Sequence, residues 1–406
     1  MKKKILTFGL MLSAFLSYGQ RERDSVYKKQ KISETDIQIL FSYYNQNGDH
    51  SAVTGGIGTE MLHVYAPEII VNHQVDSLNS YTIDGGADVI TSASADNIDF
   101  NRSSASRIDT RSYLNISYQR KLKHSDTHLG ISTGQSIESA YRSTPLGFSF
   151  DHKNVSGTRE IAASIQCYFD DLRWGLLDPD YYHPITVVYP YELRYKKWFT
   201  NYQRYSYNLS FALYQVINRR MQLALLPELV YQKGLLCTPF HRVFFNDHYT
   251  EKVENLPMQR WKIPLAVQLN IFAGNRTIIR SYYRFYWDDF GITAHTFKLE
   301  VPVKLSATFT VAPLARFYTQ TAAKYFEPYE QHALDEEFYT SDYDLSKFNS
   351  YEIGLSLRYA PHAQFIKKYF FQEVALRYAY YERTNKLNGN MISLLFDINH
   401  SGKKSK

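Results

Sequence analysis

The stretch AHTFKLEVPVKL, residues 294–305, carries an apolar side chain at nearly every second position. Phe297, Leu299, Val301 and Val303 form one set, and charged residues fill most of the gaps between them. Alternation with a period of two is typical of a β-strand, because successive side chains point to opposite faces of a sheet. Such a strand fits a soluble sandwich with water outside, or a membrane barrel with lipid outside and water inside.

The same alternation recurs along the chain and predicts about sixteen strands. The candidates centre near residues 40, 67, 86, 116, 132, 148, 165, 210, 227, 266, 283, 299, 314, 355, 376 and 395. Short links, such as 123–126 and 274–275, take turns with long ones, such as 174–201 and 323–346. Short periplasmic turns and long extracellular loops are typical of outer-membrane barrels, and an even strand count returns both termini to the periplasm. We therefore predict an all-β, transmembrane, up-and-down antiparallel β-barrel rather than a soluble or periplasmic β-protein.

The composition agrees with this fold class. The chain of 406 residues contains 35 tyrosines, and outer-membrane barrels carry aromatic girdles at both membrane interfaces. The net charge of +6 is modest and spread along the chain, so it does not favour a nucleic-acid partner. Beyond the N-terminus, no window approaches the roughly 18 apolar residues of a transmembrane helix.

The N-terminus predicts export. Lys2, Lys3 and Lys4 precede an apolar stretch at 5–16, and small residues follow at 17–19. We expect residues 1–19 to be a signal peptide cleaved before Gln20, with no cysteine after the cleavage point to make a lipoprotein. The expected domains are then a periplasmic segment at 20–34, the barrel at 35–400 and a periplasmic basic tail at 401–406.

Two cysteines, Cys167 and Cys237, remain in a compartment that permits disulfides. The predicted strands separate them by one further strand. Their backbones should then lie about 10 Å apart, which is beyond the reach of a disulfide. We expect no bond between them.

Energetics decide which face meets lipid. A base near the middle of the membrane costs roughly 2–4 kcal/mol when it faces lipid, and an acid somewhat less. The charged face should therefore line a watery lumen. The predicted lumen-facing residues are Arg280, Arg284, Lys298, Glu300, Lys304, Arg316, Glu352, Arg358, Glu373 and Arg377. The predicted lipid-facing residues are Phe297, Leu299, Val301, Val303, Leu355, Leu357, Leu394 and Phe396.

Four prolines oppose the strand pattern. Pro227, Pro264, Pro302 and Pro313 fall inside predicted strands, and each removes a hydrogen-bond donor from a sheet that should have no edge. They predict bulges or local slips of register.

Three other motifs have both a chemical and a structural interpretation. Residues 130–134, GISTG, match the serine-hydrolase pattern G-x-S-x-G, but their flanks alternate as a strand, so we expect no catalytic role for Ser132. Two acidic pairs, Asp178 with Asp180 and Asp342 with Asp344, offer oxygen ligands for calcium, yet two carboxylates are too few for such a site. The bases and aromatics at 196–199, KKWF, suit an aromatic girdle or contacts with lipopolysaccharide phosphates. We predict no catalytic, cofactor or metal residues.

Several stretches of the sequence are distinctive: DVITSAS at 88–94, YYHPITVVYPYELR at 181–194, LVYQKGLLCTPFHRVFF at 229–245, RSYYRFYWDDFGITAHT at 280–296, FYTQTAAKYF at 317–326 and FYTSDYDLSKFNS at 338–350. Together they resemble a family of uncharacterised Gram-negative proteins, a domain of unknown function expected to form outer-membrane barrels. The resemblance spans nearly all of the mature chain. It implies no catalytic residues, because the family has no assigned activity. Similar proteins tend to be encoded beside a small lipoprotein, a flavin transferase and a thioredoxin-like protein.

Two functional hypotheses follow. In the first, a monomeric barrel in contact with lipid and lipopolysaccharide is a scaffold or conduit for a small periplasmic lipoprotein with flavin-linked redox chemistry, which the resemblance implies. In the second, it is a passive porin for small polar solutes. An outer-membrane hydrolase acting through Ser132 is the least favoured alternative.

Overall fold

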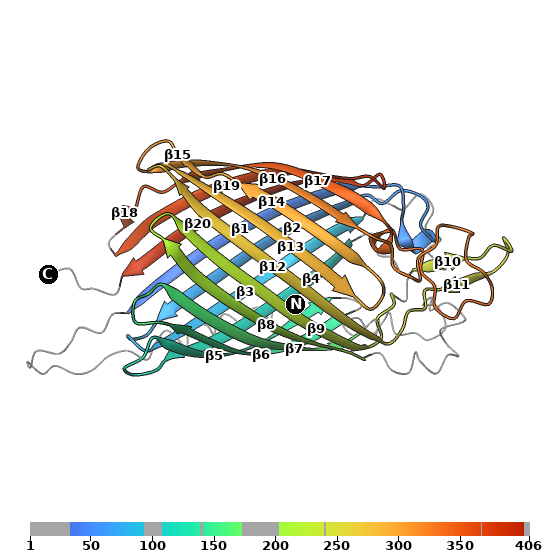
Figure 1. The fold of residues 1–406 in the computed structure, drawn as a ribbon, viewed down its shortest axis with the longest axis horizontal. Helices are drawn as coiled ribbons and strands as arrows, with labels where there is room; N and C mark the ends of the chain where they lie inside the picture. The colour runs from blue at the N-terminus through green and yellow to red at the C-terminus, as the bar shows by residue number, and fades with distance from the viewer. Residues whose placement is uncertain are drawn as a thin grey trace, which may run out of the picture. The chain divides into compact units, whose positions relative to one another are not determined.

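The computed structural model describes residues 33–92, 108–138, 141–172, 203–238, 241–366 and 368–401, and these form a closed antiparallel barrel of tilted strands (Figure 1). The first nine strands are β1 (Glu34–Asn47), β2 (Leu62–Gln74), β3 (Asn79–Ser92), β4 (Ile108–Lys121), β5 (Thr127–Glu138), β6 (Tyr141–Lys153), β7 (Arg159–Asp171), β8 (Gln203–Asn218) and β9 (Met221–Gly234). The second group in the wall is β12 (Gln259–Ala273), β13 (Thr277–Asp288), β14 (Thr293–Glu300), β15 (Val303–Lys304), β16 (Phe309–Gln320), β17 (Phe348–Tyr359), β18 (Ala363–Ile366), β19 (Tyr369–Arg383) and β20 (Asn388–Ser401).

Neighbours in sequence are neighbours in the wall, and the first strand closes the circle with the last. β1 pairs with β2 on one side and with β20 on the other, from Glu34 opposite Ser401 to Asn47 opposite Asn388. We call each continuous strand of the barrel wall a stave, and we count β14 with β15 as one stave and β17 with β18 as another. The described chain then forms sixteen staves. Closure removes the free edges that an open sheet would expose.

The sixteen predicted strand centres each fall inside a different stave, so the predicted fold class is confirmed. The predicted alternation of short and long connections holds only in part. Every connection at the end of the barrel that carries Glu34 and Ser401 is short, as expected for the periplasmic side. At the other end, however, residues 289–292 and 384–387 are also short connections, so the predicted long loops are not present after every second strand.

Outside the wall, the long connections carry small elements of their own. β10 (Arg242–Phe244) and β11 (Glu251–Val253) form a two-stranded sheet beyond the ends of the barrel strands (Figure 1). Two single-turn 3-10 helices, η1 (Ala52–Thr54) and η5 (Tyr343–Leu345), lie in other connections at the same end of the barrel. In the described part of the chain, no helix has the length and apolar character needed to cross a membrane.

The in-strand prolines do not shift the register, contrary to our prediction. The pairing of β9 with β12 keeps one register on both sides of Pro227, and Pro313 pairs directly with Leu355. Pro302 interrupts a stave and separates β14 from β15, yet both segments keep the same register against β16. The carbonyl of Pro302 still accepts a hydrogen bond from the Ile278 amide, at 2.9 Å. The stave therefore loses only the one hydrogen bond that a backbone amide at position 302 would donate.

The two cysteines lie where the strand pattern predicts. Cys167 is on β7 and Cys237 follows the end of β9, with β8 between these strands. They form no disulfide with each other. The expected signal peptide and residues 402–406 of the expected basic tail at 401–406 lie outside the described residues.

Candidate functional site: the polar wall and the ordered mouth

Direct cross-strand pairing shows which side chains share a face of the wall. Lys298 pairs with Arg316, and Arg316 pairs with Glu352, so these three side chains lie on one face. Residues paired in the same way, or two positions along a strand, extend this charged face to the whole predicted lumen-facing set: Arg280, Arg284, Lys298, Glu300, Lys304, Arg316, Glu352, Arg358, Glu373 and Arg377. The structure thus brings all ten onto a single face.

Most of the charges on this face are matched by a neighbour of opposite sign. Arg280 lies 3.2 Å from Glu300, and Lys298 lies 3.9 Å from the same carboxylate. Arg316 lies 3.4 Å from Glu352. The Arg284–Glu228 pair, at 3.8 Å, and the Arg358–Glu373 pair continue the pattern around the wall. Each hydrated pair contributes little to stability, on the order of 0–1 kcal/mol, but the five bases and four acids in these pairs cancel most of one another's charge.

The opposite face presents apolar side chains to the surroundings. The exposed fractions of Phe297, Leu299 and Ile353 are 51%, 46% and 69%. Leu355 and Phe396 of the predicted lipid-facing set are also exposed, while Val301, Val303, Leu357 and Leu394 are half-buried, and all eight lie on this face. A belt of exposed apolar residues around a closed barrel is what a membrane-spanning barrel presents to lipid, whereas a soluble protein rarely exposes so large a patch.

On the charged face, a recess of about 550 Å³ lies near the end of the barrel that carries Glu34 and Ser401, the predicted periplasmic end. Side chains of seven adjacent staves, β17, β19, β20, β1, β2, β3 and β4, contribute to it, across the seam where the barrel closes. A single recess shared by so many neighbouring staves requires the concave side of the wall. Every residue that lines it is polar: Glu34, Asp36, Asn72, His73, Gln74, Ser80, Thr82, Gln119, Arg358, His362, Gln372, Glu373, Asp397 and Asn399.

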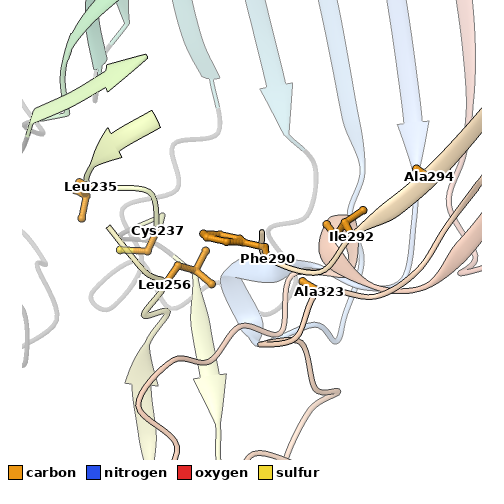
Figure 2. Packing of buried hydrophobic residues seen from close by; sticks show 7 residues of the cluster. All are labelled: Leu235, Cys237, Leu256, Phe290, Ile292, Ala294 and Ala323. Atoms are coloured by element: carbon orange, nitrogen blue, oxygen red, sulfur yellow. The ribbon is translucent and has the colours of Figure 1, made fainter. Parts of the chain in front are cut away.

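The buried apolar core of the described chain lies at the other end of the barrel, the predicted extracellular end, where several connections pack together. We call residues 48–61, 241–258, 289–292 and 321–347 the mouth assembly. The largest buried cluster joins this assembly to the residues that follow β9 and to the start of β14, and it contains Leu235, Cys237, Leu256, Phe290, Ile292, Ala294 and Ala323. In Figure 2, Phe290 points toward Cys237 and Leu256, with Ile292 and Ala323 nearby. These connections therefore form a packed unit with a core of their own.

The mouth assembly is attached to the charged face of the wall. Gln320, at the end of β16, donates its side-chain amide to the carbonyl oxygens of Asp344, at 2.9 Å, and Ser346, at 2.6 Å. Arg383, at the end of β19, pairs with the Asp344 carboxylate. Both anchors lie on the same face as Arg316 and Glu352. The η5 segment is thus held at the rim of the concave side, so it lies toward the opening of the barrel.

Close backbone packing also holds the connection between β1 and β2 against this unit. Gly56 has a φ of +89°, and a Cβ at this position would lie 2.7 Å from the carbonyl oxygen of Ser341. Only glycine satisfies both the left-handed backbone and this close approach. Residues 48–61 therefore sit directly on the segment that leads into η5.

A cluster of titratable side chains lies within the mouth assembly. His241 Nδ1 is 3.7 Å from both Glu254 Oε1 and Asp342 Oδ2, and Glu254 is only 2% exposed. Burial and the charge of Asp344 raise the pKa of Asp342 to about 6, although His241 opposes this shift. Burial lowers the pKa of His241, but the nearby Glu254 and Asp342 carboxylates outweigh it and raise that pKa to about 9. Burial and the same acidic surroundings raise the pKa of Glu60 to about 7. The region holds more negative charge than the nearby bases balance.

The other sequence motifs have clear positions. Ser132 lies within β5, paired with Ser117 and Gly147, and not at the strand-to-helix turn that the hydrolase motif requires. Asp342 and Asp344 do not act as one pair, because Asp344 binds Arg383 while Asp342 turns toward His241. Asp178, Asp180 and residues 196–199 lie outside the described residues.

Sequence reasoning missed His241 and Glu254. They lie in connections with no periodic pattern, far in sequence from Asp342, and only the packing of the mouth assembly brings the three together. The only available signal was the pairing of a histidine with acids in long connections, which is common on solvated surfaces.

Comparisons with known proteins add the following. No curated protein matches the sequence. Solved structures with a similar course of the chain include OccK1 (OpdK) of Pseudomonas aeruginosa, at 8% identity and a TM-score of 0.41, covering 91% of this chain and 98% of that one. OccAB4 of Acinetobacter baumannii has 7% identity and a TM-score of 0.43, and the match covers 93% of this chain and 100% of that one. A bacterial polysaccharide outer membrane secretin has 9% identity and a TM-score of 0.43, and the match covers 92% of this chain and 99% of that one. The likeness is too low to transfer a function.

The family comparison is a match of the sequence itself, and it covers more than half of the chain. Residues 73–399 match the family described as "Protein of unknown function (DUF3570)", from the second stave of the barrel to the last. This agrees with the resemblance seen in the sequence motifs. The chain is a closed β-barrel that belongs to the DUF3570 family.

Proposed function

We propose that the barrel is a passive conduit for small polar solutes, with its charged face lining an aqueous lumen. The observation that carries this proposal is the recess of about 550 Å³, in which seven neighbouring staves present only polar side chains to one concave space. Polar groups of this density are costly to bury without water. A hydrated lumen satisfies them, and a hydrated lumen is what a diffusing polar solute requires.

The charge pattern supports a conduit with weak overall selectivity. Pairs such as Arg316–Glu352 and Arg280–Glu300 hold opposite charges next to one another on neighbouring staves, so each base is largely compensated by an acid. The recess near the periplasmic end is more acidic, because Glu34, Asp36 and Asp397 share it with few bases. Rings or clusters of acids favour cations in aqueous pores. We therefore expect a modest preference for cations over anions.

The mouth assembly sets the access to this lumen. Because η5 is anchored on the concave rim by Gln320 and Arg383, we propose that this unit narrows the extracellular entrance. Solutes then pass a constriction formed by packed connections before they reach the polar wall.

Planar bilayers test the conduit directly. The purified full-length protein, inserted into a bilayer between KCl solutions, should give stepwise and lasting conductance increments. Replacing both acids in Asp36→Asn/Asp397→Asn should reduce the cation preference, read from the reversal potential in a KCl gradient. A barrel that inserts and stays silent contradicts the proposal.

The scaffold hypothesis, in which the barrel receives a flavin-linked periplasmic lipoprotein, stays a prediction. The expectation of a monomer in contact with lipopolysaccharide also stays a prediction. Purification of the protein from its native membrane distinguishes scaffold from conduit. A silent barrel with a stoichiometric lipoprotein that carries covalent flavin favours the scaffold. Lasting conductance without such a partner favours the conduit.

A further inference from the structure

Three side chains from two separate connections converge in the mouth assembly. His241 and Glu254 flank the β10–β11 sheet, and Asp342 caps η5 about ninety residues later. His241 Nδ1 lies 3.7 Å from Glu254 Oε1 and 3.7 Å from Asp342 Oδ2. One ligand atom from each residue lies within 4.8 Å of the other two.

These distances do not fit a simple ion pair. The other His–carboxylate pairs in the described part of the chain are at hydrogen-bond distance: 2.6 Å for His128–Asp151, 2.8 Å for His248–Glu330 and 2.6 Å for His332–Glu336. A protonated His241 would donate to one carboxylate at about 2.7–2.9 Å. Instead Nδ1 is buried, equidistant from both acids, and makes no hydrogen bond. A buried nitrogen without a partner calls for a ligand or an ion.

The two carboxylates are already held in place by other groups. Glu254 Oε2 accepts a hydrogen bond from the Thr238 amide at 2.6 Å, and Oε1 accepts one from the Thr340 hydroxyl at 2.5 Å. Asp342 Oδ1 accepts from the Asp344 amide at 2.9 Å, which leaves Oδ2 directed at His241. Supporting hydrogen bonds of this kind orient the ligands of metal sites.

We propose that His241, Glu254 and Asp342 form a zinc site. In a tetrahedral site with bonds of ~2.1 Å, neighbouring ligand atoms lie roughly 3.4 Å apart, close to the 3.7 Å seen here. One imidazole with two carboxylates suits zinc better than calcium or magnesium, which prefer oxygen ligands alone. The side chains of His241 and Asp342 are 19% and 23% exposed, which leaves access for a water molecule as fourth ligand.

The bound ion would connect two parts of the mouth assembly that are distant in sequence. Residues 241–258 and 321–347 already share the isolated bridges Phe245–His332 and Asn255–Tyr339. A metal bridge between Glu254 and Asp342 adds a link that depends on the ion. This inference concerns the order of the mouth assembly and does not depend on whether the barrel conducts.

The test uses the purified full-length barrel in detergent, stripped of metal with EDTA and titrated with zinc chloride by calorimetry. We expect one zinc ion per chain. Asp342→Asn and Glu254→Gln should each weaken zinc affinity by more than the about 10-fold that loss of an outer-shell contact costs. In parallel, cobalt(II) should give the intense visible absorption of tetrahedral coordination, and both variants should lose it.

His248→Ala is the matched control. It removes a histidine that pairs with Glu330 and so joins the same two connections, but it leaves the three proposed ligands intact. Its zinc affinity should equal that of the unchanged protein. Asp342→Asn changes a partly exposed carboxylate and keeps its size, so this variant remains informative if Glu254→Gln does not fold. Heat-modifiable migration on a gel shows whether each variant is folded. Absence of zinc uptake by the unchanged barrel, or equal uptake by the folded Asp342→Asn variant, overturns the site.

Discussion

The guanidinium of Arg260 forms an ion pair with the carboxylate of Asp288, which is fully buried at the end of β13. Arg260 Nε donates to Asp288 Oδ2 at 3.1 Å, and the Tyr286 hydroxyl donates to the same oxygen at 2.7 Å. The other oxygen, Oδ1, accepts from the Ile292 amide at 3.0 Å. Arg260 also stacks on the ring of Phe290, 4.4 Å from its centroid. One carboxylate therefore joins the wall to the connection that leads into the buried cluster of the mouth.

Asp288→Asn should loosen this junction. The change leaves the Arg260 charge without its buried partner, and removal of one member of a buried pair costs about 3–5 kcal/mol. Because the pair lies at the rim, we expect much of the loss as faster hydrogen exchange at residues 289–292. The exposed residue Asp335 offers the control: Asp335→Asn should change the free energy of unfolding by less than about 0.5 kcal/mol. Equal exchange in both variants would show that the pair contributes nothing.

The assignment of the two faces is tested by placing a base on each. Leu299→Arg puts a charge on the exposed apolar face near the middle of its stave and should lower the free energy of unfolding in lipid vesicles by about 2–4 kcal/mol. Thr296→Arg puts the same charge on the opposite face, beside Arg284, and should cost much less. Urea titration measures both. A larger loss for Thr296→Arg would reverse the faces.

Neutralising one member of an ion pair should tune the ion preference of the conduit. Glu352→Gln leaves the Arg316 charge unbalanced, so the reversal potential in a KCl gradient should move toward anions. Arg316→Gln should move it toward cations. These opposite shifts arise only if both side chains face the conducting path, and two shifts of the same sign would place them elsewhere.

The folded conformation of the connection between β1 and β2 should become less stable as pH rises. Burial, with the charges of Asp344 and Asp342, raises the pKa of Glu60 from 4.5 to about 7. A carboxyl whose pKa is higher in the folded state stabilises that state while protonated, so its contribution is present below pH 4.5 and is lost as pH rises toward 7. Protection of the amides at 51–60 from exchange, corrected for intrinsic rates, should be higher at pH 5 than at pH 8. Glu60→Gln should abolish this difference.

The wall could be predicted from the sequence because its constraint is local. In the stretch from Phe297 to Val303, each position must suit either lipid or water. This requirement makes apolar and polar side chains alternate with a period of two along every stave. The prolines show where local reasoning fails. Pro302 lacks a donor, and the sequence therefore predicts a bulge, but pairing on both sides of it keeps the register. The sheet tolerates one missing bond because the neighbouring bonds fix the stave.

The mouth could not be predicted in this way. Phe290, Leu256 and Ala323 meet in one cluster although they come from three connections, and none belongs to a repeating pattern. The same holds for His241 and Asp342, which are a hundred residues apart. Contacts between irregular segments depend on where the staves end in space, and that position follows only from the closed barrel.

The separation of the exposed apolar belt from the buried cluster at the mouth has a consequence for how the protein responds to solvent. The belt is stable only in contact with hydrocarbon, whereas the cluster around Phe290 is stabilised by exclusion of water. A detergent with chains too short for the belt should strain the staves while the extracellular unit keeps its packing. Cooling, which weakens water exclusion, should instead loosen that unit first and leave the membrane-embedded cylinder intact.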